Sequence, residues 1–271
     1  MNGMPLVQYS RKAGIITGAL FLVFNLVHGQ TIDHWESVTR EGMEVTYLVP
    51  QSELPASWNE PSFNDASWAT GVTGIGYGDG DDQTVVDPCI SVYLRYSINI
   101  QDTAKITSLL LDMDFDDAFA AYLNGIEIAR YNLGEPGSPT TWNQQSDGYH
   151  EALLYQGQLP MRFNLHDSLV DALRPGNNIL AVEVHNHSVN SSDLTANAWL
   201  QAGIADTTRM FSPVPDWFVA PVREATTLPV ITINTNGQTI PDEPRITAHM
   251  GIINNGQGNL NHPSDIPNVY D

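Results

Sequence analysis

The stretch Asp114–Arg130, DFDDAFAAYLNGIEIAR, decides the fold class of this chain. Within it, Asn124-Gly125 separates two short apolar-rich runs, Phe119–Leu123 and Ile126–Arg130. Both turn residues take positive φ readily, and Asn-Gly is the preferred pair of a type I′ hairpin turn. The stretch therefore predicts a β-hairpin. The run that precedes it, Ile106–Phe115, predicts a further strand.

Period-two alternation extends this prediction along the chain. In Ile106–Phe115, four apolar residues fall on one face and Asp112 and Asp114 on the other: the apolar four are Leu109, Leu111, Met113 and Phe115. Three further runs read as strands: Val92–Ile100, expected to be half-buried, Ile179–His185 after the turn Arg174–Asn178, and Ala198–Ile204. One helical turn is expected over Leu165–Leu173. Many short strands predict an all-β fold, a sandwich or jelly roll.

Composition narrows the classes of partner. With 42% hydrophobic and 15% charged residues, the 271-residue chain has enough apolar surface for a core. Eleven Lys and Arg stand against 31 Asp and Glu, a net charge of −20. Phosphate binding needs Lys and Arg, so nucleic acid and anionic membrane surfaces are not expected partners. A solvated acidic surface is the first interpretation, and carboxylate clusters that hold Ca²⁺ are the second.

Residues 1–29 are typical of a secretory signal peptide. Arg11 and Lys12 precede an apolar run, Ala13–Val27, and the small Gly29 fits a cleavage site before Gln30. The alternative is an uncleaved membrane anchor, for which the run is short. We expect a secreted or cell-surface protein with no membrane insertion after cleavage. The single cysteine, Cys89, rules out an intramolecular disulfide and is expected to be a small buried hydrophobe.

A family resemblance rests on four segments. Asp114–Arg130 and Gly176–Asn186, together with Phe63–Trp68 and Gly74–Asp82, resemble the galactose-binding-like jelly rolls appended to secreted bacterial proteins. The resemblance spans most of Trp35–Ile204 and implies a galactose-binding-like β-sandwich over residues 30–206. It also implies that the Asp-Asp hairpin and the Glu-Val-His-Asn strand end are largely architectural.

The remaining residues carry a second resemblance. Residues 207–227, with three prolines, are expected to form a linker with few core contacts. In residues 228–271, Leu228–Gln238 and Met250–Gly256 resemble the opening of a CotH-type (spore-coat, atypical kinase) domain. The resemblance implies a truncated start of that domain without its catalytic residues, hence no enzymatic activity and a longer parent protein. A small β extension packed on the jelly roll is the alternative.

Two groups of acids are candidate Ca²⁺ ligands. Asp79, Asp81 and Asp82 surround a flexible glycine and can wrap a hard cation; a solvated turn is the alternative. Asp116 and Asp117 stand beside the hairpin, where hydrogen bonds to its backbone are the alternative. Any cofactor is therefore expected to be Ca²⁺.

Sugar recognition needs an aromatic platform beside polar groups. The candidate ligand-binding residues lie in expected loops: Trp142, Tyr149, Tyr77, Asn143 and His150. For Trp142 the alternative is an anchor that packs its own loop. Trp58 and Trp68 are assigned to the core or its rim.

Glu183, His185 and His187 could form a metal site, but structural hydrogen bonding by Glu183 and His185 is the favoured interpretation. The sequence contains no motif for nucleophilic catalysis. We therefore expect a secreted, non-catalytic carbohydrate-binding or accessory module at the N-terminus of a larger protein. Its partner would be an extracellular carbohydrate or a cell-surface protein. The alternative is a structural spacer that positions a downstream CotH-type kinase domain.

Overall fold

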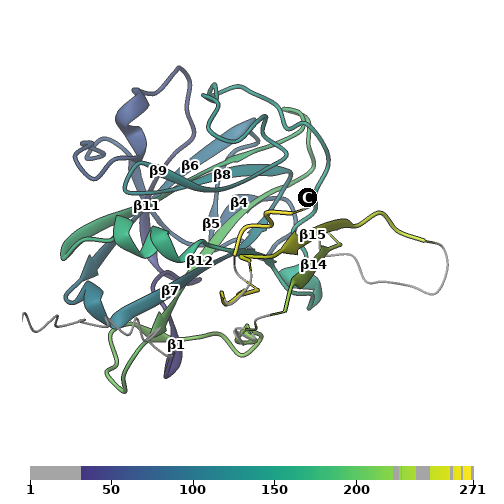
Figure 1. Ribbon diagram of the computed structural model, residues 1–271. Helices are drawn as coiled ribbons and strands as arrows, with labels where there is room; N and C mark the ends of the chain where they lie inside the picture. The colour runs from purple at the N-terminus through teal and green to yellow at the C-terminus, as the bar shows by residue number, and fades with distance from the viewer. Residues whose placement is uncertain are drawn as a thin grey trace, which may run out of the picture.

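The computed structural model describes residues 32–221, 226, 228–235, 245–256, 259–263 and 265–269. The expected signal peptide, residues 1–29, lies outside the described residues. Two antiparallel-rich β-sheets pack face to face, which confirms the all-β sandwich (Figure 1). No helix among the described residues is long and apolar enough to cross a membrane.

The first sheet has seven strands. Its main order is β10 (Met161–Asn164), β7 (Ile106–Phe115), β12 (Leu194–Ile204), β1 (His34–Ser37) and β13 (Ser212–Pro213), and β12 also pairs with β4 (Ile75–Tyr77), which pairs with β5 (Thr84–Val85). The second sheet has six strands, in the order β3 (Ala69–Val72), β2 (Glu44–Leu48), β6 (Ser91–Ile100), β11 (Gly176–His185), β8 (Ala118–Leu123) and β9 (Ile126–Tyr131).

The hairpin forms as predicted. Asn124 and Gly125 have φ angles of 53° and 88°, and Leu123 pairs with Ile126 across the turn. Asn124 also fastens the turn to β11, because its Oδ1 accepts the N–H of Ile179 at 2.9 Å. Its Nδ2 donates to Asn178 Oδ1 at 2.7 Å.

The core lies between the two sheets, and the apolar face predicted for β7 points into it. Leu109, Leu111, Met113 and Phe115 are all buried there, opposite Leu180, Val182 and Val184 of β11. Burial of this apolar area from both sheets supplies the main driving force for folding. Cys89 is free and buried, as expected.

The outer face of the second sheet is also covered, so β6 is more buried than its alternation predicted. Trp58, from the 3₁₀ turn η1 (Ala56–Asn59), packs edge-on against Tyr93 at 4.7 Å and together with Trp68 forms a second apolar cluster. This confirms the assignment of both tryptophans. Beside them Arg95, 2% exposed, binds Asp65 at 2.8 Å. Residues 53–68 thus close this face of the sheet.

Residues 207–219 pack against the first sheet: Met210 and Phe211 contact the core, and β13 pairs with β1. The expectation of a linker with few core contacts is therefore wrong for this part of 207–227. Glu36 Oε2 accepts the N–H groups of Met210 and Phe211, both at 2.8 Å. Trp217 packs edge-on against Trp199 at 5.3 Å. These residues bind the sheet because Glu36 and Trp199, both buried and distant in sequence, provide a hydrogen-bond acceptor and an aromatic ring. We call residues 207–219 the strap.

The tail forms its own two-stranded sheet, drawn in yellow in Figure 1. β14 (Val230–Asn234) pairs with β15 (His249–Ile253), so the apolar run after Leu228 finds its strand partner within the tail. The remaining short elements are 3₁₀ turns: η2 (Thr103–Lys105), η3 (Leu154–Gln156) and η4 (Asp167–Ala172). The last lies within Leu165–Leu173 and confirms the helical turn expected there, in 3₁₀ form.

Candidate functional site

Two of the five predicted ligand-binding residues, Trp142 and Asn143, line the same hollow, which has a volume of about 840 Å³. We call it the groove. It is bounded by the strand ends and loops around β2, β3, β5 and β6: its other lining residues are Tyr47, Leu48, Val49, Pro50, Gln51, Ser67, Ala69, Val85, Val86, Asp87, Pro88, Cys89, Ile90, Ser91 and Val189. Trp142 is half-buried and Asn143 is exposed.

The backbone of Trp142 is fixed on both sides. Its carbonyl oxygen accepts the hydroxyl of the buried Ser91 at 2.5 Å, and its N–H donates to Glu53 Oε2 at 3.4 Å. Trp142 lines the groove, and its ring stacks on neither Tyr131 nor Tyr149, whose ring partners include His150 and His187. Hydrogen bonds of the main chain therefore anchor this loop.

A second hollow, of about 460 Å³, lies on the other side of this contact. Glu53 lines it, together with Trp58, Tyr93, Tyr122 and Thr140 among others. Residues 47–51 and 142–143 help to line the first hollow, and residues from 53–59 and 137–140 help to line the second.

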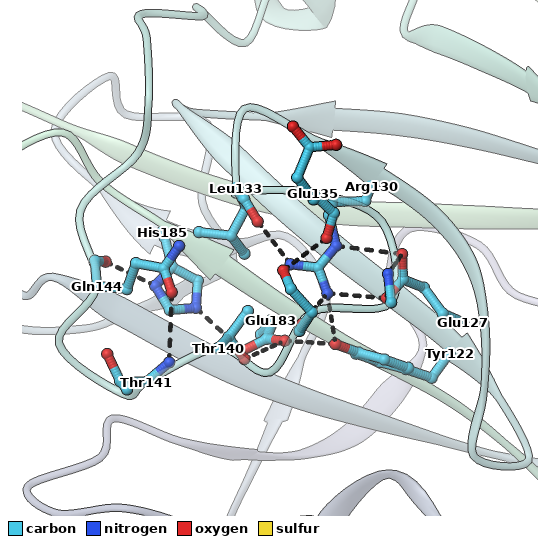
Figure 2. A network of polar contacts seen from close by, with 12 residues as sticks. Tyr122, Glu127, Arg130, Leu133, Glu135, Thr140, Thr141, Gln144, Glu183 and His185 are labelled. Carbon is cyan, nitrogen blue, oxygen red and sulfur yellow. Dashed lines mark hydrogen bonds and ion pairs between the residues drawn. The ribbon is translucent and has the colours of Figure 1, made fainter.

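Beneath the loop that carries Trp142, a buried carboxylate collects hydrogen bonds (Figure 2). Glu183 of β11 is fully buried and accepts the Tyr122 hydroxyl at 2.8 Å and the Thr140 hydroxyl at 2.9 and 2.8 Å. His185 Nε2 lies 3.1 Å from the same carboxylate. Burial alone would raise the pKa of Glu183, but the hydrogen bonds and charge of His185, with the tyrosine hydroxyls, bring it below its ordinary value.

The other groups of this network bind the loop backbone directly. His185 Nδ1 lies 2.8 Å from the carbonyl oxygen of Gln144. Both ring nitrogens therefore lie beside oxygen atoms, so His185 links the buried carboxylate to the loop backbone. Arg130 of β9 donates to the carbonyl oxygens of Leu133 and Ser138 at 2.5 and 2.9 Å and pairs with Glu127 at 2.8 Å. In Figure 2 these side chains rise from the sheet toward residues 133–144, so the sheet fixes the loop.

The other three predicted ligand-binding residues do not join the groove. Tyr77 is 6% exposed; its hydroxyl accepts from Asn186 Nδ2 at 2.9 Å, because β4 pairs with β12 and points the ring into the core. His150 stacks on Phe115 with the ring centroids 4.0 Å apart. Tyr149 is 76% exposed but lies beside His187, away from the lining residues. Tyr77 and His150 are thus packing residues.

The first predicted group of acids does come together. One carboxylate oxygen from each of Asp79, Asp81 and Asp82 lies within 4.8 Å of the others. One oxygen of Asp79 and both of Asp82 are buried without a hydrogen-bond partner among the described residues. Burial and the neighbouring Asp79 raise the pKa of Asp81 and of Asp82 to about 7. Gly76 makes room, because a Cβ there would lie 2.5 Å from Asp82 Oδ1.

Asp116 and Asp117, the second predicted group of acids, have different partners. Asp117 accepts the N–H groups of His150 and His187 at 2.9 and 2.8 Å, so hydrogen bonding to the backbone occupies both of its oxygens. Asp116, 4% exposed, instead groups with Glu151 and Asp193, which the sequence analysis missed. Burial and the charge of Asp117 raise the pKa of Asp116 to about 9. Acidic groups that could hold a metal ion therefore exist at two places. The group of Asp116, Glu151 and Asp193 could not be predicted from the spacing of acids in the sequence.

The side chains of Glu183, His185 and His187 do not converge on one metal site. Strand β11 ends at His185, and His187 Nδ1 faces the Ser146 hydroxyl at 3.3 Å. Glu183 and His185 instead make the structural hydrogen bonds described above.

The fold of this chain is similar to parts of larger glycosidases. No protein-family model matches it, and no curated protein matches it in sequence. Three similar solved structures are a Bifidobacterium dentium β-glucuronidase (18% identity, TM-score 0.36), a calcium-binding mutant of Bacteroides uniformis β-glucuronidase 2 (13%, 0.40) and a Bacteroides vulgatus β-glycosidase (11%, 0.35). They cover 58%, 84% and 61% of this chain, and the chain covers 21%, 27% and 20% of theirs.

The chain thus spans about a quarter of the length of these enzymes. Their activities belong to those proteins.

Proposed function

We propose that the sandwich is a secreted, non-catalytic accessory module of galactose-binding-like type that binds carbohydrate in the groove. The observation that carries this proposal is the position of Trp142, a half-buried residue that lines the groove while its backbone is held by Ser91 and Glu53. Aromatic faces pack on the apolar faces of sugar rings, and the amide of Asn143 can pair with hydroxyl groups.

The network around Glu183 supports the proposal because it holds the loop before any ligand arrives. A binding loop that is already ordered loses little conformational entropy on binding, so more of the contact energy appears as affinity. Thr140, Gln144 and Ser138 are all fixed from beneath by side chains of the sheet.

A glycan array with the full chain tests this function. We expect binding to at least one class of extracellular polysaccharide, lost in Trp142→Ala and kept in Tyr149→Ala, which removes an exposed aromatic ring outside the groove. A folded chain that binds no glycan would contradict the proposal.

For the cation, we propose that Asp79, Asp81 and Asp82 hold Ca²⁺. Several carboxylate oxygens close together suit a hard cation with many oxygen ligands, and the unpartnered oxygens of Asp79 and Asp82 would gain a partner. A bound Ca²⁺ would neutralise charges that otherwise repel one another across the loop between β4 and β5.

A second candidate function is a protein-interaction spacer that positions a downstream CotH-type domain. The observation that favours it is the tail hairpin, where Ile231 pairs with Ile252 and Ile233 with Met250 on one face. Ile231, Ile233 and Met250 are 60%, 63% and 41% exposed. A two-stranded sheet with an open apolar face is typical of a segment that packs against another surface. Ile231→Glu should abolish capture of that domain if the spacer role holds, and leave glycan binding unchanged.

A further inference from the structure

We propose that the groove selects glycans that carry free amino groups and rejects acidic glycans, and that Asp87 sets this selection. The inference rests on the proposed carbohydrate-binding function and names its ligand class. Two carboxylates carry it: Asp87 lines the same groove as Trp142, and Glu53 accepts the Trp142 N–H.

Asp87 is the one charged side chain among the described residues that line the groove. It is exposed, and Lys, Arg and His are absent from that lining. Among the described residues it forms no ion pair. Its carboxylate is therefore available to a ligand.

A second carboxylate contacts the backbone of Trp142. Glu53 is exposed, accepts the Trp142 N–H and likewise forms no ion pair among the described residues. Glu127, which lines the second hollow with Glu53, differs: Arg130 binds it at 2.8 Å and neutralises it. The uncompensated negative charge thus gathers beside the proposed sugar platform.

A ligand ring stacked on Trp142 would meet this charge. The carboxylate of a uronic acid would face two like charges in a protein of net charge −20, which raises the cost of its approach. An ammonium group would pair with Asp87 or Glu53 and could also lie over the indole face. A neutral N-acetylated sugar would experience neither this repulsion nor this attraction, so its affinity should lie between those of the acidic and the amino sugar.

Calorimetric titration of the full chain with three oligosaccharides of equal length tests the inference: glucosamine oligomers, their fully N-acetylated counterparts and oligogalacturonate. We expect affinity to decrease in that order at low ionic strength. Asp87→Asn should reduce the preference for the amino sugar about fivefold, as expected for one charge pair near a surface. High salt should reduce it similarly in the unaltered chain.

Asp171→Asn is the matched control, because it removes one exposed negative charge from η4, outside the groove lining. An equal effect of Asp171→Asn and Asp87→Asn would assign the preference to the overall charge and overturn the role of Asp87. Equal affinity for the three oligosaccharides would overturn the selection but leave carbohydrate binding intact. Binding of none of these and of no glycan on the array would overturn the proposed function itself.

Discussion

Thr140 donates its hydroxyl to the fully buried carboxylate of Glu183, 2.9 and 2.8 Å from its two oxygens. This contact joins a loop to the strand beneath it. The same loop continues through Trp142 into the groove, so a side chain in the second sheet determines where the proposed sugar platform stands.

Thr140→Val should loosen this loop. The change keeps the shape of the side chain but removes one donor to a buried charged acceptor, so we expect a loss of about 1–3 kcal/mol in the free energy of unfolding. Amide hydrogen exchange should speed up in residues 134–145 and stay unchanged in β12. Thr107→Val, which removes a hydroxyl bonded to the Gly203 carbonyl, is the control and should leave the loop protected. Equal exchange in both variants would contradict this positioning role.

Glu183 should also make stability depend on pH. Its pKa in the folded protein lies below the ordinary value of 4.5, so the unfolded chain binds more protons than the folded chain as the pH falls through this range. Its stabilisation is therefore present above about pH 4.5 and is lost as the pH falls through the folded pKa.

Urea unfolding at several pH values measures this effect. We expect the free energy of unfolding to fall less steeply on acidification in Glu183→Gln than in the unaltered chain, although the variant is less stable at neutral pH because His185 loses its charged partner. Parallel pH profiles for the two proteins would show that Glu183 does not contribute.

The hairpin and the core face of β7 could be predicted because their signals are local. Asn124 and Gly125 satisfy the turn by their own conformations, and alternation alone places Leu111 and Met113 inward. The early half of β12 escaped prediction because it carries Thr195 and Asn197, polar residues that become buried beside β4 and β7.

The site could be predicted only in part. Trp142 and Asn143 are adjacent in sequence, so one loop brings both to the groove. The prediction of Tyr77 as a ligand-binding residue was wrong because the local sequence does not indicate that β4 pairs with β12 in the first sheet. Asp116 meets Asp193 only through the fold.

The strap should resist proteolysis. Because Glu36, Trp199 and Arg162 hold it, we expect limited proteolysis to spare residues 209–219 in the unaltered chain. Trp217→Ala removes one of the packed rings and should expose this segment to cleavage before the sandwich unfolds. A first cut between Met210 and Phe218 in the unaltered protein would contradict the packing described here.

Calcium should stabilise the folded chain. We expect the melting temperature to be higher in millimolar CaCl₂ than in chelator, because a ligand that binds the native state stabilises it by mass action, and magnesium should have a smaller effect. Asp82→Asn should abolish most of the difference, whereas Asp171→Asn should preserve it. Equal melting temperatures with calcium and with chelator would remove the proposed cation site.

The binding role of Trp142 is tested most directly by measuring glycan affinity and unfolding free energy together in Trp142→Ala. Titration would use the polysaccharide that the array identifies, with Tyr149→Ala measured in parallel. If the ring is a platform, the variant should lose about 1–3 kcal/mol of binding free energy with nearly unchanged stability, because Ser91 and Glu53 hold the loop through its backbone. Lower stability with unchanged affinity of the folded protein would instead make Trp142 a loop anchor and contradict the proposed groove.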